Sequence, residues 1–406
     1  MQVSIDYGCE RLEVNVEPDR LVRVHQQPQA PPLEDPVAAV RGALETPIGF
    51  PALRRALTPD DQVAVVLDEH VPCLPELLSP VLQHLTEARV ALEAITLVCP
   101  PTQISQNWVE RLPAEFRHVR VEVHDPTDRR RLSYLATTGK GRRIYLNRRV
   151  VDADQLVLVT QRSFDPLLGY SGSEGALYPT LSDEATLKEM GGLLSMKVPG
   201  EKPWPARQEA AEVAWLLGAP FVVHLIAGAG QAITHVLAGL VDTGEEAVRL
   251  LNARWRLTVD GLADVVVAGV CGDPDAHGFS VLSEALACAA RVVKPQGRIV
   301  LLTAAKPVLG AASELLRQAE DPTQALGLLR RHGSSGMAAA FQWASAAQRA
   351  TVYLLSRLPD ETAEELFTVP LEHAGQVQRL LDSAPACLFL SDAQKSLAVA
   401  SNSHAD

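Results

Sequence analysis

The amino-acid sequence predicts an α/β protein of two domains, with mainly parallel sheets and a cleft between the domains. Three observations support this fold class. Continuously apolar segments alternate with helical segments, as in parallel sheets whose strands are buried on both faces. Hydrophobic residues make up 47% of the chain and aromatic residues only 5%, so the core must consist mostly of Leu, Val and Ala. The length of 406 residues exceeds the usual size of one domain.

Strand–helix alternation runs through residues 1–262, which we expect to form the N-terminal domain. The segment begins with the alternating pattern of a hairpin and continues as βαβ units. In order, we expect a hairpin within 1–25, a helix at 35–47, a strand at 61–70, a helix at 73–90, strands at 94–101, 119–125, 142–147 and 155–160, a helix at 205–218, an antiparallel pair at 219–228 and 232–240, and a helix at 244–259.

A second α/β section begins near residue 263 and forms the predicted C-terminal domain, residues 263–406. No low-complexity linker or internal repeat marks the boundary, so the division rests on the order of the elements alone. We expect strands at 263–270, 294–305 and 349–357, helices at 279–293, 312–321 and 322–332, and a last segment at 385–400 that ends the fold.

Charge and hydropathy exclude several classes of protein. The net charge of −12 argues against general nucleic-acid binding, which needs a cationic surface. No run of roughly 18 apolar residues predicts a membrane span. The N-terminus lacks a basic segment followed by an apolar one, so we expect a cytoplasmic protein. The expected partner is a small anionic molecule or a protein subunit, which includes a second copy of the chain.

A glycine-rich stretch, GYSGSEGALYP at residues 169–179, follows the predicted strand at 155–160. It therefore belongs at the carboxyl edge of the sheet, where open parallel sheets bind ligands. The backbone amides of Ser171 and Gly172 would cradle a phosphate or a carboxylate there. The competing interpretation is a turn that the fold itself requires.

A basic segment runs from Arg129 to Arg149 and contains eight Lys or Arg residues and no acidic residue. Such a segment would attract an anionic ligand or partner. The alternative, which we favour from the sequence, is a solvated strand edge protected by charge.

Several segments resemble those of the nickel-dependent lactate racemase family in their order and spacing. The family has an opening helix with an N-P-I-G turn, a strand that carries D-x-x-R-P-x-P, and a loop that reads G-F-S-G-G-x-K. The corresponding segments here are residues 31–57, 61–85, 141–159, 169–187, 263–279 and 289–302. The resemblance covers most of the chain and implies the two-domain fold predicted above.

The resemblance also implies a chemistry, the inversion of a 2-hydroxy acid. In the family, a nickel pincer nucleotide accepts a hydride from the substrate carbon and returns it to the other face. A lysine of the glycine-rich loop anchors the pincer, and a histidine nitrogen binds nickel. Two further histidines, in G-x-H-R and E-P-H contexts, serve as acid and base for the hydroxyl.

The strand motif and one acid–base position differ from the family pattern. Asp68 keeps the first residue of the strand motif, but Val71 replaces its arginine and cannot bind a carboxylate. His70 is a substitute donor or an incidental polar cap. Asp165 replaces one acid–base histidine, either as a base whose pKa burial raises or as a turn former before proline.

The other acid–base position, the anchor and the metal position also differ. Thr102, followed by Gln103, replaces the remaining acid–base histidine. A hydroxyl is a poor base. The alternative interpretation of these residues is a simple turn. Gly175 stands at the position of the anchoring lysine and has no amine. Met190 stands at the position of the nickel histidine, where core packing explains it better than metal binding.

No histidine occurs between His124 and His224, so a small shift of the alignment restores no imidazole. We therefore expect neither a metal nor the pincer, and a degenerate site that binds a small anion or a partner through Thr102, Gln103 and the loop residues Ser171, Gly172 and Gly175. The alternative is an active 2-hydroxy-acid racemase or epimerase rebuilt on Asp68, His70 and Asp165. Carboxylates that converge with raised pKa values would favour this alternative, whereas apolar filling would favour a third hypothesis, a structural protein.

Overall fold

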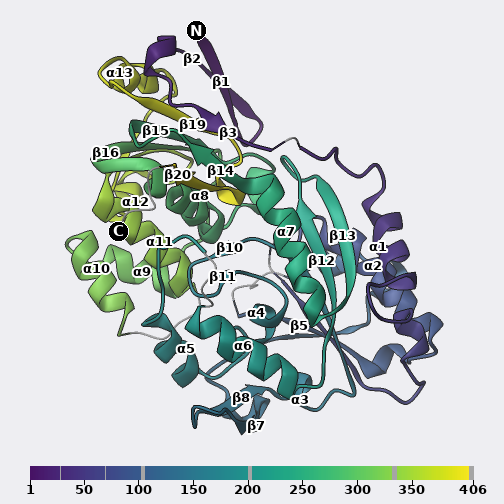
Figure 1. The fold of residues 1–406 in the computed structure, drawn as a ribbon. Helices are drawn as coiled ribbons and strands as arrows, with labels where there is room; N and C mark the ends of the chain where they lie inside the picture. Colours follow the sequence, from purple (N-terminus) through teal and green to yellow (C-terminus); the bar gives the residue numbers. More distant parts are fainter. Residues whose placement is uncertain (28, 69, 102–105, 200–203, 332–335, 402–406) are drawn as a thin grey trace. The chain divides into compact units, whose positions relative to one another are not determined.

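The computed structural model describes residues 1–27, 29–68, 70–101, 106–199, 204–331 and 336–401 (Figure 1). Clustering of contacts between Cα atoms divides the chain into two compact units. Unit 1 comprises Met1–Gln29, Gly191–Val198 and Ala253–Asp406, and unit 2 comprises Ala30–Met190 and Pro199–Asn252. Each unit thus combines segments that are far apart in the sequence. The single boundary expected after residue 262 stays a prediction.

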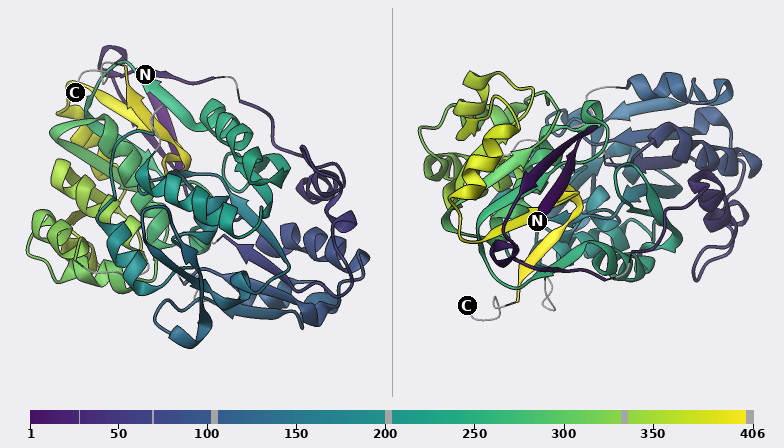
Figure 2. Two further views of the ribbon diagram at one scale, coloured as in Figure 1. Left: turned by 60° about the horizontal axis from the view of Figure 1, so that its bottom comes forward. Right: turned by 90° about the horizontal axis from the view of Figure 1, so that it is seen from above.

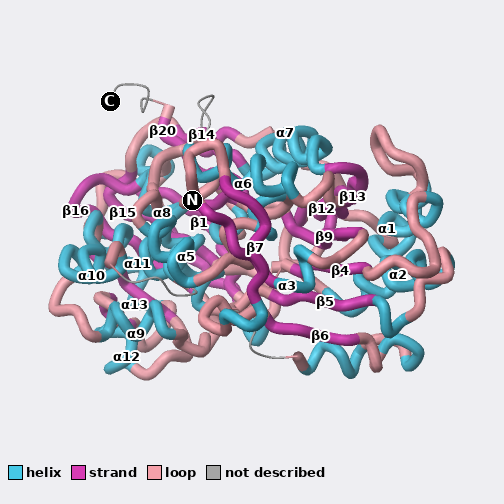
Figure 3. The backbone as a smooth tube through the Cα atoms, turned by 90° about the horizontal axis from the view of Figure 1, so that it is seen from below, coloured by secondary structure: helices cyan, strands magenta, loops and turns pink. Residues whose placement is uncertain are grey.

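Unit 2 contains a six-stranded sheet with the order β13-β12-β9-β4-β5-β6. All neighbouring pairs are parallel except β12 with β13, and Figure 3 shows β12, β9, β4, β5 and β6 side by side. The chain runs from β4 to β5 and β6 and then returns to the other side of β4 as β9, so the winding reverses between β4 and β9. The strands are β4 (Val63–Leu67), β5 (Ile95–Cys99), β6 (Arg120–Val123), β9 (Gln155–Gln161), β12 (Phe221–Ala227) and β13 (Ile233–Leu240).

Helices cover both faces of this sheet. Successive residues of a strand point to opposite faces, so an apolar strand presents side chains to the helices on each side. Val65 packs on one face and Val66 on the other, and both side chains are fully buried. This two-sided burial explains why β4 reads as a continuous apolar run. The first face packs with α1 (Pro36–Glu45) and α2 (Leu74–Glu87), and the second with α3 (Arg148–Val151), α4 (Glu174–Leu177) and α6 (Pro205–Leu216).

Shorter elements of unit 2 lie outside the main sheet. The strands β10 and β11 pair Phe164 with Tyr170 and so bring together the two ends of the turn that precedes the glycine-rich loop. A second small hairpin carries much of the basic segment. These elements are β7 (Leu132–Thr137), β8 (Arg143–Asn147), β10 (Phe164–Asp165), β11 (Gly169–Tyr170) and α5 (Glu184–Gly191).

Unit 1 contains a five-stranded, fully parallel sheet with the order β18-β17-β16-β15-β19. The helices α8 to α11 and the short helix α12 (Asp360–Glu365) pack on one face, and the N-terminal hairpin packs on the other with α13; Figure 2 shows the purple hairpin beside the strands of its own unit. The strands are β15 (Ala263–Gly269), β16 (Val293–Leu302), β17 (Thr351–Leu355), β18 (Thr368–Pro370) and β19 (Cys387–Leu390), the hairpin is β1 (Gln2–Tyr7) and β2 (Glu10–Asn15), and the helices are α8 (Phe279–Val292), α9 (Ala311–Arg317), α10 (Pro322–Leu329), α11 (Met337–Arg349) and α13 (Gly375–Asp382).

The α/β class with parallel sheets is confirmed, and the expected buried strands are present. One boundary was wrong: the helix expected at residues 244–259 ends at Trp255, where α7 (Gly244–Trp255) gives way to β14 (Arg256–Val259). Leu257 and Val259 alternate into the core while β14 pairs with β20 (Leu397–Ala400). In the described part of the chain, no helix combines the length and the apolar character needed to cross a membrane.

Candidate functional site

The point where the winding of unit 2 reverses, at the carboxyl ends of β4 and β9, is the expected ligand edge of such a sheet. Asp68 directly follows β4, and Gln161 is the last residue of β9. The backbone N–H of Gln161 donates to Asp68 Oδ2 at 3.2 Å. The carboxylate therefore joins the two strands on either side of the reversal.

Asp68 also fixes the position of His70. Its Oδ1 accepts from the backbone N–H of His70 at 3.1 Å and lies 3.1 Å from ring atom Nδ1. A carboxylate only accepts hydrogen bonds, so Nδ1 is the donor in this pair. The side chains of Asp68 and His70 are 12% and 21% exposed. Val71, at the position of the family's arginine, is buried in the core between the sheet and α2.

Asp165 is the last residue of β10, and its Oδ1 accepts from the N–H groups of Leu167 at 2.8 Å and Leu168 at 2.6 Å in the turn that follows. Burial raises the pKa of Asp165; the two amides and His70 oppose the shift, and Asp68 adds to it. This mutual influence places Asp165 at the same edge as Asp68 and His70. Asp165 therefore stabilises the turn and also has the raised pKa that a base would need.

The polar groups of Ser171 are occupied by its own surroundings. Its N–H donates to Ser163 O at 3.0 Å, its Oγ lies 2.5 Å from Ser163 Oγ, and its carbonyl accepts from Arg162. Gly172 has φ of +75°, and a Cβ there would lie 3.0 Å from Gln161 O. The glycine therefore lets the loop approach the end of β9, as a turn required by the fold would do.

The anchor position is surrounded by apolar side chains. Gly175 lies in α4 and is buried, and a Cβ added to it would lie 2.5 Å from Leu168 Cδ1. Leu168 is itself only 4% exposed and packs with Tyr178 and Met190. A side chain at position 175 would therefore displace a packed core residue.

Sequence reasoning missed Arg162, whose side chain lies beneath the glycine-rich loop. It is 1% exposed, and it donates from Nη1 to Ser171 O at 2.6 Å and from Nη2 to Gly244 O at 3.0 Å. Among the described residues, its Nε has no hydrogen-bond partner and no carboxylate lies within ion-pair distance. Burial lowers the pKa of Arg162 to about 10, although Glu174 opposes this shift. The signal was available, since a cation directly follows an apolar strand at a ligand edge.

Two further buried polar groups lie next to Arg162. Ser173 has φ of +52°, and its buried Oγ has no partner among the described residues. His224 on β12 is fully buried, its Nε2 lies 3.1 Å from Thr243 Oγ1, and its Nδ1 has no partner among the described residues. Burial lowers the pKa of His224, and the charge of Arg162 lowers it further. The site thus combines one cation with several buried polar atoms.

Other candidate ligands have structural explanations or lie elsewhere. Thr102 and Gln103 lie outside the described residues. His124 is buried and donates from Nε2 to Ser182 O at 2.8 Å. Met190 is 1% exposed and belongs to the small core that also contains Leu168.

One group of three side chains in the described part of the chain has the spacing of a metal site, namely Glu45, His84 and Glu87. These residues belong to α1 and α2, on the face of the sheet opposite α4. Arg54 already binds both carboxylate oxygens of Glu45, at 2.8 and 2.9 Å. The group is therefore explained by this ion pair.

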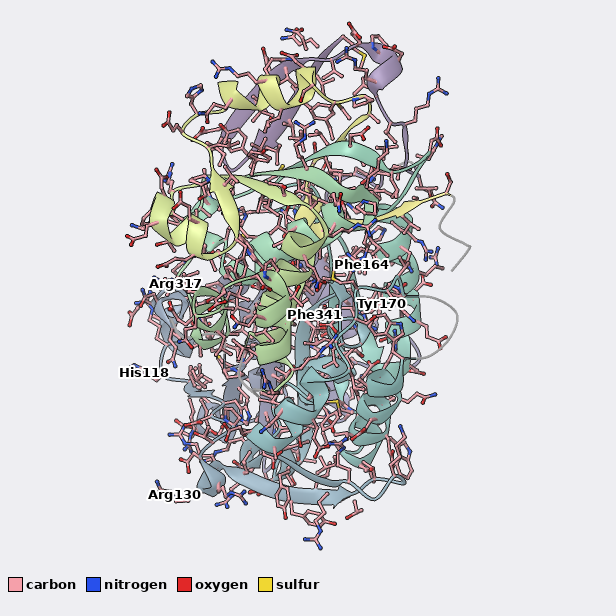
Figure 4. All side chains as sticks on the ribbon, turned by 90° about the vertical axis from the view of Figure 1, so that its left-hand side faces the viewer. His118, Arg130, Phe164, Tyr170, Arg317 and Phe341 are labelled. Carbon is pink, nitrogen blue, oxygen red and sulfur yellow. The ribbon has the colours of Figure 1, made fainter. Side chains whose placement is uncertain are left out.

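Aromatic rings frame the turn that presents the loop. Phe164 and Tyr170 lie next to each other in Figure 4, with ring centroids 5.8 Å apart. Arg207 lies over the Tyr170 ring at 5.5 Å, and the Tyr170 hydroxyl exchanges hydrogen bonds with Asn252. The turn is thus held on both sides, which positions Asp165 and the loop relative to β9.

Comparison with known proteins identifies relatives of this fold. Residues 7–198 match the family model of the lactate racemase N-terminal domain. No curated protein matches the chain in sequence. The lactate racemase apoprotein from Thermoanaerobacterium thermosaccharolyticum has a similar structure, with a TM-score of 0.76 and 16% identity over 98% of this chain and 100% of that chain.

A crystal structure of a Thermotoga maritima protein is also similar, with a TM-score of 0.67 and 13% identity over 93% of this chain and 100% of that chain. At such low identities these likenesses show the fold alone. The family model covers the strand after which Asp68 stands, the glycine-rich loop and Met190. The fold and the N-terminal match agree: residues 7–198 resemble a lactate racemase N-terminal domain, and the whole chain has the fold of the lactate racemase apoprotein.

Proposed function

We propose that this lactate racemase-like protein binds a small carboxylate, of the 2-hydroxy-acid class, at the carboxyl edge of β4 and β9, and that it does so without the nickel pincer. The observation that carries the proposal is Arg162. A buried cation without a carboxylate partner costs folding free energy and is retained most readily where it serves a ligand. Its neighbours Asp68 and Gln161 stand at the reversal of winding, where sheets of this kind bind small molecules.

The residues at the family's cofactor positions do not fit the pincer. Gly175 offers no amine, and Leu168 occupies the space beside it. Met190 offers only a weak thioether ligand and is packed in the core. No step of a reaction is therefore assigned to nickel or to the pincer in this chain.

The edge offers complementary groups for a hydroxy acid. Arg162 supplies positive charge in a buried setting, where charge acts strongly. The hydroxyls of Ser163 and Ser171 are bonded to each other at 2.5 Å, and a ligand that displaces this bond would find a donor and an acceptor there. Asp165 and His70 stand where the hydroxyl of such a ligand would find an acceptor and a donor.

Isothermal titration calorimetry with D-lactate, L-lactate, malate and acetate tests this proposal. We expect saturable binding of at least one hydroxy acid, and a loss of about tenfold or more in affinity for Arg162→Met, since a charged hydrogen bond contributes roughly 1.5–3 kcal/mol. Arg249→Gln is the matched control, because Arg249 is exposed and pairs only with Glu246 among the described residues.

Ser163→Ala provides a second variant that leaves the buried cation in place, in case Arg162→Met does not fold. We expect it to weaken binding as well, because it removes one of the two hydroxyls. Absence of binding to all four acids by the unaltered protein would refute the proposal. Equal affinities of the unaltered protein and both site variants would also refute it.

A second candidate function is favoured by one observation, the raised pKa of Asp165 beside the Asp68–His70 pair. A carboxyl group with a raised pKa and an oriented imidazole at one edge are the two groups that an acid–base racemase would need. Exchange of the C2 hydrogen of lactate or malate for deuterium in D₂O tests this candidate. It predicts exchange that Asp165→Asn abolishes, and no exchange in the unaltered protein would eliminate it.

A further inference from the structure

A second polar site lies on unit 2, away from the glycine-rich loop. It is a surface hollow of about 690 Å³ next to the edge strand β6. We call it the basic hollow. Its charged lining consists of Arg120, Glu122, Arg130, Arg131, Arg148 and Arg149.

The arginines of the basic hollow come from three separate elements. Arg120 belongs to β6, Arg130 and Arg131 to the 3₁₀ turn Arg129–Arg131, and Arg148 and Arg149 to α3. Protection of a strand edge requires charge on the strand itself. It does not require a turn and a helix to bring four more arginines around one concave surface. The sequence-based preference for a simple charged edge therefore leaves most of this arrangement unexplained.

The acidic groups near the basic hollow orient its arginines but are too few to balance them. Glu122 accepts from Asn147 at 3.1 Å and lies 3.5 Å from Arg149. Asp128 lies 3.4 Å from Arg130 and 3.5 Å from Arg131. Five guanidinium groups thus face two carboxylates, in a chain whose net charge is −12.

The cations of the basic hollow remain accessible. The side chain of Arg130 is 93% exposed and that of Arg131 51% exposed, and Figure 4 shows Arg130 at the outer edge of the protein. Arg148 donates from Nε to Ser133 Oγ at 3.3 Å. This bond orients the side chain, which is exposed to solvent. Guanidinium forks of this kind bind phosphate oxygens in pairs.

We propose that the basic hollow binds a compact polyphosphate, through the phosphate groups alone. The volume lies within the range of small-molecule sites, roughly 300–1,000 Å³. Among the described residues, its lining contains no aromatic side chain on which a base would stack. A ligand would therefore be recognised by its charge and oxygen spacing, and a nucleoside attached to it would add little.

Calorimetric titration with inorganic tripolyphosphate tests the proposal, with orthophosphate, citrate and ATP as comparison ligands. We expect tripolyphosphate to bind about as tightly as ATP, and orthophosphate at least about tenfold more weakly, because fewer guanidinium groups engage it. Affinity should fall as salt rises, since the lining is exposed to solvent. Binding of citrate as tight as that of tripolyphosphate would contradict recognition of phosphate.

The variant for this test is Arg130→Gln combined with Arg148→Gln, two exposed residues from different elements. We expect it to weaken tripolyphosphate binding by at least about tenfold and to leave hydroxy-acid binding unchanged. Arg143→Gln is the matched control, because Arg143 belongs to the same basic segment but not to the lining.

Three results would overturn the proposal. The first is no tripolyphosphate binding by the unaltered protein. The second is an equal loss in the Arg143→Gln control. The third is sedimentation that shows self-association abolished by the double variant, without tripolyphosphate binding, which would identify the basic hollow as a contact with an acidic surface of a second copy. Failure here leaves the hydroxy-acid proposal intact, since the two sites share no residue.

Discussion

Both sheets of this protein contain a point where the winding reverses, between β4 and β9 in unit 2 and between β15 and β19 in unit 1. At the point in unit 1, Asp392 follows β19 and pairs with Lys395 at 2.9 Å. At the point in unit 2, Arg162 follows β9 and has no carboxylate within ion-pair distance among the described residues. Equivalent positions in two parallel sheets thus carry a charge in an ion pair and a charge that has no ion-pair partner among the described residues.

The difference is the reason for proposing a ligand site at the edge in unit 2 and not at the edge in unit 1. A buried ion pair is compatible with a purely structural edge, because each charge compensates the other. In unit 1 the hairpin also covers the end of β15, where Asp6 and Ile5 take the space next to Gly269. In unit 2 the edge combines Arg162, a buried cation outside any ion pair of the described residues, with a carboxyl group of raised pKa, Asp165. Perturbed groups of this kind gather at ligand sites more often than elsewhere.

The largest expected effect is a difference in the free energy of unfolding between variants that remove the cation at each edge, Lys395 in unit 1 and Arg162 in unit 2. Lys395→Met leaves the buried Asp392 without this cation and should cost about 3 kcal/mol in the free energy of unfolding. Arg162→Met removes a charge that makes no ion pair among the described residues, so the cost should be limited to the two bonds to Ser171 and Gly244, under about 2 kcal/mol. Urea denaturation followed by circular dichroism measures both. A larger cost for Arg162→Met than for Lys395→Met would reverse the comparison.

The next effect concerns the filled anchor position. Gly175→Ala should cost about 2 kcal/mol, because its Cβ meets Leu168 in a packed core. In a Leu168→Ala background the same substitution should cost clearly less, since the obstructing atoms are gone. A double-mutant cycle by urea denaturation measures this coupling. Independent, additive costs would show that Leu168 does not occupy the anchor space.

A smaller effect concerns the backbone of the loop. Ser173 has φ of +52° and ψ of −128°, a region that only glycine enters easily, and its buried Oγ has no partner among the described residues. Ser173→Gly should therefore raise the free energy of unfolding by about 1 kcal/mol. Thermal denaturation checks the direction. A lower melting temperature would mean that Ser173 makes a contact worth more than the strain.

The smallest expected effect is on the pH dependence of stability. Asp165 has a pKa above its usual 3.8 in the folded state, so the folded protein binds a proton more tightly than the unfolded chain does. Stability from this group is thus present at low pH and is lost as pH rises from the usual value through the raised one. Asp165→Asn keeps the Oδ1 acceptor for the amides of Leu167 and Leu168 and removes the titration.

Melting temperatures of the unaltered protein and of Asp165→Asn, measured from pH 3 upward in one buffer series, test this expectation. The variant should gain relative to the unaltered protein as pH rises through the window. A constant difference between the two proteins would show that Asp165 titrates alike in the folded and unfolded states.

The buried strands could be predicted from the sequence because their physical signal is local. β4, β5 and β9 are apolar without interruption, and only a two-sided parallel sheet buries such runs. The helix α11 was not predicted from Met337–Arg349, a segment that is rich in alanine and short of large apolar side chains. Its alanines are buried by tertiary packing on α8, which no local pattern reveals.

The candidate site could be predicted only in part, for a similar reason. Asp68, His70 and Asp165 could be proposed from the sequence because they occupy recognisable motif positions, and their role stays a prediction. Arg162 was missed because an arginine at a strand end is usually exposed, and only the loop that folds over it buries it. The filling of the anchor position by Leu168 was also invisible, since side-chain packing across seven residues of a loop has no sequence signature.

The most direct test of the central claim is intact-mass spectrometry of the protein expressed with nickel and the enzymes that build the pincer nucleotide. Because Gly175 offers no amine and Leu168 occupies its space, we predict the unmodified mass and no inversion of lactate by polarimetry. A stoichiometric covalent adduct together with lactate inversion would contradict this account.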